Sequence, residues 1–142
     1  MPYKLKTLQG YYDEVWTKGN LEAIPDYFAP DARTRGIMGD MPFDADDLAD
    51  LIFMIREQLG PITITLPITV DQDEWLSALV EVKSHAVASG DPVHVFGQMI
   101  ARFDGQKMSE VYSGVDSLLL FEQLGCLPEN AMAVMLSGTR LR

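Results

Sequence analysis

The segment from Arg102 to Gly125, RFDGQKMSEVYSGVDSLLLFEQLG, constrains the fold most because it combines a turn signal, a strand pattern and an apolar helical run. Its Asp104-Gly105 pair predicts a tight hairpin turn, since both residue types tolerate the positive φ that such turns require. The two arms of the hairpin are VHVFGQMIARF and KMSEVYSGVD. Strands joined in this way pair antiparallel, so an antiparallel sheet is expected at the centre of the fold.

The second arm carries polar side chains on one of its faces. Side chains alternate along a strand, which puts Glu110, Tyr112, Gly114 and Asp116 on one face and Val111 on the other. If the polar face lines a cavity, its carboxylates are shielded from water. Desolvation raises the pKa of a carboxyl group, and this allows an Asp to hold and pass a proton near neutral pH. Asp116 is therefore a candidate catalytic acid or base.

The sequence before residue 61 has helical periodicity. Apolar residues at helical spacing predict an amphipathic helix over residues 3–18, which Gly19 ends, and LEAIPDYFA predicts a second, short helix. A third helix is expected after Asp44, because acidic residues in a first turn complement the helix dipole. Gly60-Pro61 stops it.

The sequence after Pro61 changes to strand-like patterns. ITITLPITV and WLSALVEVKSHAVA precede the two hairpin arms, and Pro67 in the first of them predicts an edge strand or a bulge. SLLLFEQLG and ENAMAVML predict helical turns at the end. This order favours an α+β fold in which helices cover one face of an antiparallel sheet. Without repeats or linkers, residues 1–142 are expected to form a single domain.

Composition limits the classes of partner. The net charge of −10 argues against nucleic acid and anionic membrane, since both attract a positive surface. No run approaches the ~18 apolar residues of a membrane helix and no signal peptide is evident, so a soluble, cytoplasmic protein is expected. The single cysteine, Cys126, is expected to fill space in the core. Without a cluster of ligand residues, no metal site is predicted.

Two segments resemble a known superfamily. YYDEVWTKGNLEAIPDYFAPDA resembles the first two helices of nuclear-transport-factor-2-like proteins, and DGQKMSEVYSGVDSLLLFEQLGCLP resembles the ending of their SnoaL-like polyketide cyclase branch. The resemblance implies a curved antiparallel sheet wrapped around N-terminal helices, a cone with a deep apolar pocket. It also implies a homodimer, no metal or organic cofactor, and a hydrophobic polyketide-like or cyclic small molecule as ligand.

The same resemblance suggests an intramolecular aldol cyclisation by acid/base chemistry. Asp116 follows Glu110 by six residues, the place of the catalytic Asp in these cyclases; alternatively, Asp116 caps the helix that follows it. Arg102 would orient Asp116 or hold an enolate, or else pair with Asp104 at the surface. The competing function is a non-catalytic binding or assembly module of the same fold.

Four further residues are candidates for substrate binding. Tyr12 occupies the place of a pocket tyrosine in related proteins, although core packing is the commoner role for a Tyr on an apolar helix face. Tyr112 lies beside Asp116 on the second hairpin arm, and Phe96 shares a face with Arg102 on the first. His85 precedes a turn that contains Gly90, where it contributes to the pocket or is solvated.

Overall fold

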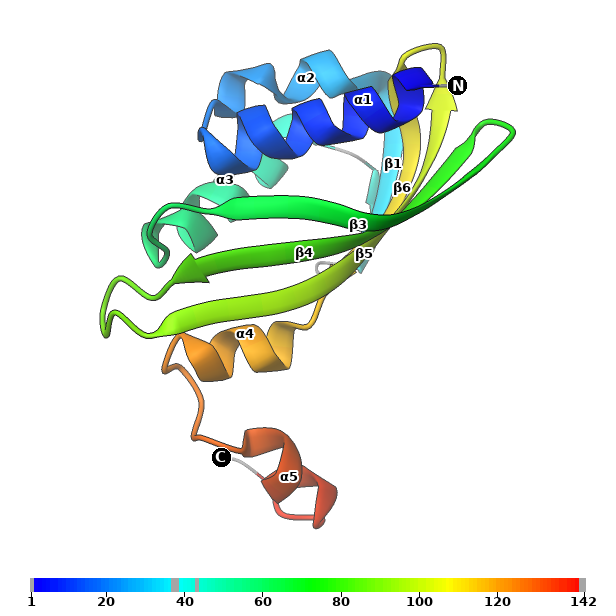
Figure 1. Cartoon of the computed structure of the whole chain (residues 1–142). Coiled ribbons are helices and arrows are strands. Elements are labelled where there is room, and N and C mark those ends of the chain that lie inside the picture. Colours follow the sequence, from blue (N-terminus) through cyan, green and yellow to red (C-terminus); the bar gives the residue numbers. More distant parts are fainter. Residues whose placement is uncertain (1, 37–38, 43, 141–142) are drawn as a thin grey trace.

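The structure, a computed structural model, describes residues 2–36, 39–42 and 44–140 (Figure 1). Helical segments come first and last, and a further helix separates the first two strands from the other four. The helices are α1 (Pro2–Tyr11), η1 (Tyr12–Thr17), η2 (Leu21–Ala23), α2 (Ile24–Tyr27), α3 (Ala45–Glu57), α4 (Ser117–Gln123) and α5 (Ala131–Leu136). The strands are β1 (Phe28–Gly36), β2 (Gly39–Pro42), β3 (Thr63–Gln72), β4 (Trp75–His85), β5 (Pro92–Asp104) and β6 (Lys107–Val115).

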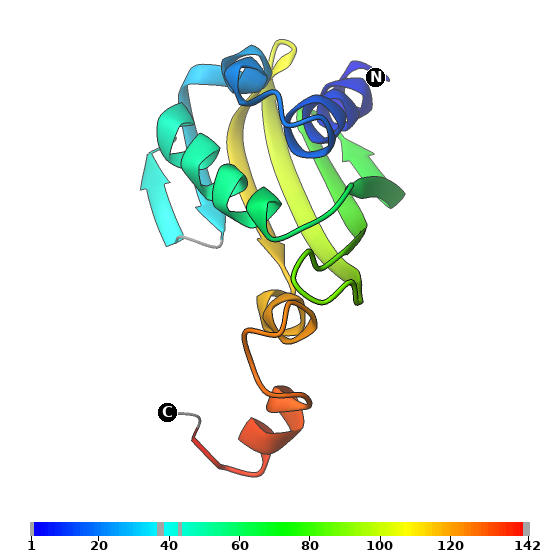
Figure 2. The same cartoon turned by 90° about the vertical axis from the view of Figure 1, so that its left-hand side faces the viewer.

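The strands form one curved sheet in the order β2-β1-β6-β5-β4-β3. Figures 1 and 2 show α1, α2 and α3 on one side of this sheet, which confirms the α+β fold. The pairs from β3 to β6 are antiparallel, as expected. However, β1 pairs parallel to β6, so the sheet is mixed. The parallel partner of β1 is distant in the sequence.

The central hairpin is confirmed, with its turn moved by one residue. Asp104 pairs with Lys107, so the two loop residues are Gly105 and Gln106. Gly105 has a φ of 63°, whereas Asp104 remains in the strand. Glycine at the first central position is typical of a type II′ turn, which needs positive φ only there.

The helix and strand boundaries follow the local signals. The Asp44 carboxylate caps α3 by accepting hydrogen bonds from the backbone N–H groups of Asp46 and Asp47, at 2.9 and 3.1 Å. The helix predicted over residues 3–18 is present, but it is α-helical only to Tyr11 and continues as a π-helix to Thr17. Pro67 lies in edge strand β3 at a shift of register, as its missing N–H requires.

Lys4 connects the N-terminal helix α1 to the turn between β3 and β4. Its side chain is only 2% exposed and forms an ion pair with Asp71, together with a hydrogen bond to the carbonyl oxygen of Asp73. This contact lowers the pKa of the Asp71 carboxyl group. Because a buried ammonium needs such partners, the pairing fixes α1 against the β3–β4 turn.

The two faces of the sheet differ in burial, and this decides where a site can form. On β5 the buried residues are Val93, Val95, Met99, Ala101 and Phe103, which point toward the helices. We call this the inner face. The alternate residues of β5, including Phe96 and Arg102, point away from the helices on the outer face. On β6 the same alternation puts Val111 on the inner face and Glu110 and Tyr112 on the outer face.

Candidate ligand pocket

A cavity of about 190 Å³ lies between the helices and the inner face of the sheet. Its wall is mainly aliphatic and aromatic, with contributions from the N-terminal helices, α3, the central strands and α4. Aliphatic lining residues are Leu48, Leu51, Ile55, Leu59, Ile62, Ile64, Val80, Val82, Val95, Met99, Val111, Val115 and Leu120. Such a wall suits an apolar ligand, with orientation supplied by the few polar groups present.

Gly97 leaves room in the pocket wall at a close approach of β5 and β6. A Cβ atom added there would lie 2.6 Å from the backbone carbonyl oxygen of Gly114. Both residues line the cavity. The backbone carbonyl cannot move aside easily, so position 97 requires glycine.

Aromatic side chains form a cluster in the pocket wall. Tyr11, Tyr12, Trp16 and Phe28 all line it, and the Tyr11 ring centroid lies 5.1 Å from that of Tyr12 and 5.4 Å from that of Phe28. The indole N–H of Trp16 donates a hydrogen bond to the Tyr11 hydroxyl at 3.0 Å. Burial raises the pKa of Tyr11 to about 12, so its hydroxyl remains neutral at physiological pH.

The structure places Tyr12 in the pocket, where the sequence suggested it would be. Burial raises the pKa of Tyr12 well above its ordinary value, and the neighbouring Tyr11 raises it further. Within the described part of the chain, the Tyr12 hydroxyl makes no hydrogen bond. It is therefore a neutral donor available to a ligand oxygen.

Two carboxylates also line the cavity, together with the neutral polar side chains of Gln98 and Ser113. Asp44 caps α3 and Asp47 lies in its first turn, and both are exposed while also bordering the cavity. The side chains that line the described pocket include no Lys, Arg or His. In the sequence these acidic residues indicate only the start of a helix, because nothing in their local pattern shows that the start of α3 reaches the pocket.

Asp116 does not line the inner pocket, and the structure gives it the alternative role, that of a helix cap. Asp116 is exposed, and its carboxylate caps α4 by accepting a hydrogen bond from the backbone N–H of Leu119 at 3.1 Å. Arg102 lies on the outer face, where its guanidinium donates to Glu110 at 3.1 Å. The predicted pair is thus outside the inner pocket, because the helices cover the opposite face of β5 and β6.

Tyr112 and Phe96 also lie on the outer face, so the expected contribution to the inner pocket is corrected for both. The Tyr112 hydroxyl donates a hydrogen bond to Glu110, and its ring stacks on Trp75 with centroids 6.5 Å apart. Phe96 is 44% exposed. Together with Asp116 they border an open depression on the outer face. The Asp116 carboxyl group is exposed there, so it is not shielded from water.

His85 is exposed at the end of β4 and does not line the cavity. Its ring lies against Gly60, where an added Cβ would be 2.0 Å from Cε1 of the ring. Its carbonyl oxygen accepts a hydrogen bond from the N–H of Gly60 at 2.9 Å. His85 therefore contributes to the connection between α3 and β4, and its expected place in the pocket is corrected.

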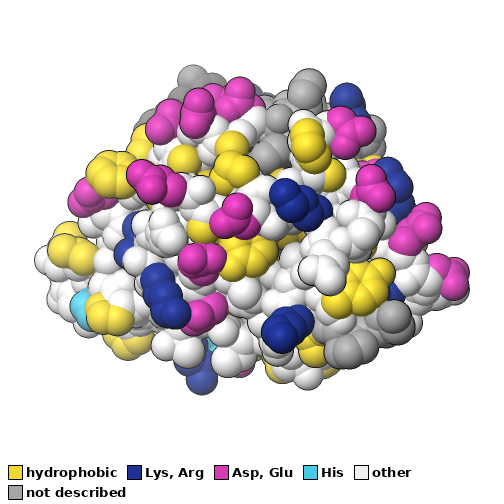
Figure 3. Space-filling view, turned by 90° about the horizontal axis from the view of Figure 1, so that it is seen from above, with side chains coloured by type: hydrophobic (Ala, Val, Ile, Leu, Met, Phe, Trp, Pro, Cys, Tyr) yellow, Lys and Arg dark blue, Asp and Glu magenta, His cyan; other side chains and the backbone are white. Residues whose placement is uncertain are grey.

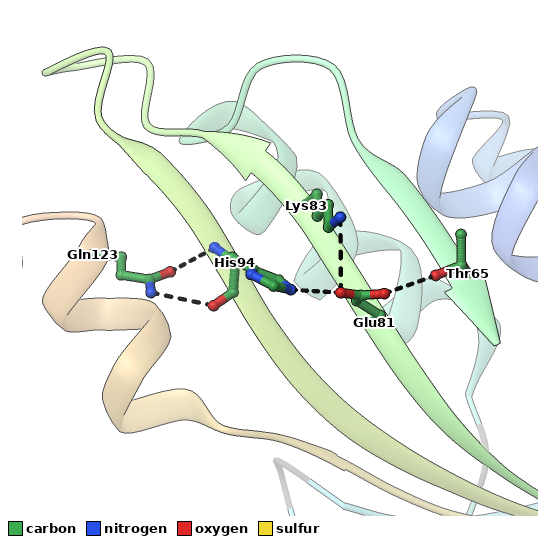
Figure 4. Close-up of polar contacts among 5 residues, drawn as sticks. All are labelled: Thr65, Glu81, Lys83, His94 and Gln123. Atoms are coloured by element: carbon green, nitrogen blue, oxygen red, sulfur yellow. Dashed lines mark hydrogen bonds and ion pairs between the residues drawn. The ribbon is translucent and has the colours of Figure 1, made fainter. Parts of the chain in front are cut away.

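A polar network on the outer face, shown in Figure 4, was not foreseen from the sequence. His94 Nε2 and Glu81 Oε2 are 2.6 Å apart, and the hydrogen bond lowers the pKa of the Glu81 carboxyl group. The Gln123 side chain accepts from the N–H of His94 at 2.8 Å and donates to its carbonyl oxygen at 3.2 Å. Beyond the end of β6, the Gln123 side chain therefore pairs with the backbone of β5 as a neighbouring strand would. These two hydrogen bonds hold α4 against β5.

Neither metal ligands nor a membrane helix is found in the part of the chain that the structure describes. No three His, Cys, Asp or Glu side chains gather there as a metal site, and none of the described helices is long and apolar enough to cross a bilayer. Cys126 is exposed, with Sγ 3.7 Å from Oε1 of Gln58, so its expected place in the core is corrected.

Solved structures with the same architecture include IdmH from Streptomyces antibioticus, a candidate polyketide cyclase (TM-score 0.74, 19% identity, 86% of this chain and 98% of that chain). A SnoaL-like candidate polyketide cyclase from Jannaschia sp. CCS1 has a TM-score of 0.73 at 12% identity, covering 89% and 94%. A protein with a ketosteroid isomerase-like fold from Catenulispora acidiphila, solved with trimethylamine, has a TM-score of 0.72 at 15% identity, covering 87% and 94%. At such identities these likenesses show the fold alone.

The sequence itself supplies the family assignment. No curated protein matches the chain. Residues 8–111 match the SnoaL-like domain, a span that covers most of the chain and runs from the end of α1 to the middle of β6. This protein therefore belongs to the SnoaL-like domain family.

Proposed function

We propose that this protein binds a small hydrophobic, cyclic or polyketide-like molecule in the inner pocket, with the Tyr12 hydroxyl donating a hydrogen bond to a ligand oxygen. The observation that carries the proposal is an apolar cavity into which a neutral hydroxyl without a described partner is built. The size of the cavity supports it. A cavity of ~150 Å³ accepts benzene, so about 190 Å³ suits one or two rings.

The energetic contribution of such a ligand is set by its apolar area. A ring that buries ~150 Å² gains on the order of 4 kcal/mol at ~25 cal/mol per Å². A hydrogen bond from Tyr12 adds roughly 1 kcal/mol. Together these terms give about 5 kcal/mol, which corresponds to a Kd of roughly 0.1–1 mM for a single-ring compound, and the cost of association weakens it further.

Binding without turnover is the function that the geometry supports best. Cyclisation by Asp116 and Arg102 has no support from their positions, because both groups lie outside the pocket and Asp116 is exposed. Cyclisation is the second candidate, favoured by the descriptions of the IdmH and Jannaschia proteins. In that case Tyr12 would hydrogen-bond the carbonyl oxygen of the reacting ketone, as a neutral donor.

Isothermal titration with 1-naphthol and naphthalene tests the proposal. Tyr12→Phe should weaken binding of 1-naphthol about 3- to 10-fold while leaving naphthalene unchanged, because only the hydroxyl is lost. Tyr3→Phe is a matched control: Tyr3 packs against Phe103 and does not line the cavity. Failure of both compounds to bind at millimolar concentration would refute a hydrophobic pocket function.

We also propose that the protein forms a homodimer through the outer face of the sheet. That face exposes Ile68, Val70, Phe96 and Ile100, of which the first two are each 60% accessible. A two-fold axis would bury this patch against itself. Light scattering at micromolar concentration should give twice the monomer mass, and Phe96→Asp should give the monomer mass. A monomeric wild-type protein would count against the proposal.

A further inference from the structure

The polar lining of the pocket has one sign of charge. Asp44 and Asp47 supply carboxylates, and no cationic side chain is among the described lining residues. The neutral polar side chains in the wall are those of Tyr11, Tyr12, Gln98 and Ser113. Most pockets that accept carboxylate or phosphate ligands offer Lys, Arg or free backbone N–H groups. Here the first N–H groups of α3 are already used, since the Asp44 carboxylate accepts from those of Asp46 and Asp47.

The charge at this end of α3 is negative despite the helix dipole. A helix N-terminus contributes roughly +0.5 of a charge, whereas Asp44, Asp46 and Asp47 are three acidic residues in and before the first turn. None of the hydrogen bonds or ion pairs between described residues involves the Asp47 carboxylate. The whole chain adds a net charge of −10, and Asp and Glu are spread over much of the face shown in Figure 3.

The same cavity is lined by aromatic rings. Tyr12, Trp16 and Phe28 line it around the buried Tyr11. The face of an aromatic ring is the negative end of its quadrupole and attracts a cation, Trp most strongly. The attraction is larger in a site from which water is excluded, and this wall is predominantly apolar.

We propose that the natural ligand of this pocket is a hydrophobic amine or quaternary ammonium compound, with its apolar body in the cavity and its positive group near the aromatic rings and Asp47. This inference rests on the proposed binding function and gives the ligand a chemical class. An anionic ligand of the same shape is disfavoured, because it would lie close to two carboxylates without a cation to compensate. A neutral ligand would use the apolar wall but not the carboxylates.

Two probes of the same shape separate charge from size. Benzyltrimethylammonium and neopentylbenzene differ by the replacement of a charged nitrogen with carbon, and phenylacetate supplies the opposite charge on a similar ring. Each is tested on the full chain by displacement of 1-naphthol at low ionic strength. The cation should bind about 3- to 30-fold more tightly than its carbon isostere, and phenylacetate more weakly than either.

A pair of variants in one helical turn locates the effect. Asp47→Asn should weaken binding of benzyltrimethylammonium about 3- to 10-fold and change that of neopentylbenzene less than twofold. Asp46→Asn removes the same charge from the same turn, but Asp46 does not line the cavity, so it should change neither affinity more than twofold. Raising the salt concentration should weaken binding of benzyltrimethylammonium only, because salt screens the exposed charge of Asp47.

The outcomes distinguish this inference from the proposed function beneath it. Equal or tighter binding of neopentylbenzene, or equal effects of Asp46→Asn and Asp47→Asn, would overturn the preference for a cation while leaving a hydrophobic pocket in place. Failure of 1-naphthol itself to bind would refute the pocket function and the inference together. Circular dichroism of both Asn variants checks that α3 remains folded.

Discussion

Substitution of Asp116 separates a helix cap from a catalytic group. The Asp116 carboxylate is exposed and accepts one hydrogen bond, from the N–H of Leu119. Loss of an N-cap costs about 0.5–2 kcal/mol, and a single exposed bond places Asp116→Ala near 1 kcal/mol. Asp116→Asn keeps an acceptor oxygen at the same place, so it should cost only a few tenths of a kcal/mol.

The measurement is urea unfolding of the two variants beside the wild-type protein. In a thermal melt, a loss of about 1 kcal/mol in the free energy of unfolding would appear as a decrease of roughly 2–5 °C in Tm for a chain of this size. Asp44→Ala provides an internal comparison: the Asp44 carboxylate accepts two backbone hydrogen bonds, so its loss should cost more than that of Asp116.

Binding of 1-naphthol to the same variants completes the test. Leu120 of α4 is 6% exposed and lines the pocket, so Asp116→Ala should weaken binding modestly through a less stable α4. Asp116→Asn should leave binding unchanged. If Asp116→Asn kept full stability but lost turnover of a polyketide substrate, Asp116 would be a catalytic group and not only a cap, because only a catalytic carboxylate has that property.

Three other perturbations test individual features of the structure. Gly97→Ala should lower the free energy of unfolding in urea by about 1–3 kcal/mol, since its Cβ would lie 2.6 Å from a backbone oxygen. Gly114→Ala should be nearly neutral, because the space around its Cβ is open. Equal costs would contradict the close approach at Gly97. Burial raises the pKa of Tyr11 from 10.0 to about 12, so the contribution of its neutral hydroxyl to stability is complete below pH 10 and decreases as the pH rises toward 12. Tyrosinate absorbance should then increase together with loss of circular dichroism. Gradual ionisation of this tyrosine in a folded protein would argue against a buried hydroxyl. The hydrogen bond with His94 lowers the pKa of Glu81, so the contribution of this pair to stability is present above the pKa of an unfolded glutamate and is lost as the pH decreases through the lower pKa of the folded state. His94→Asn should therefore make acid unfolding less steep in that range. An unchanged profile would exclude the pair as a source of stability.

Local signals in the sequence determined most of the secondary structure. The β5–β6 hairpin, the start of α3 at Asp44 and the irregularity at Pro67 each depend on neighbouring residues, through turn geometry, capping and a missing N–H. The alternation along β6 was also correct, because it follows from the geometry of an extended chain. Tyr12 could be assigned to the pocket because the family resemblance places a tyrosine there.

Only the tertiary structure decided which face of the sheet encloses the site. Alternation groups Glu110, Tyr112 and Asp116 on one face without saying whether helices cover it, and the helices cover the other. The exposed position of Asp116 and the approach of Asp47 to the pocket depend on how α4 and α3 pack against strands distant in the sequence. Packing over such separations follows from burial of apolar area by the whole chain, and no short segment records its outcome.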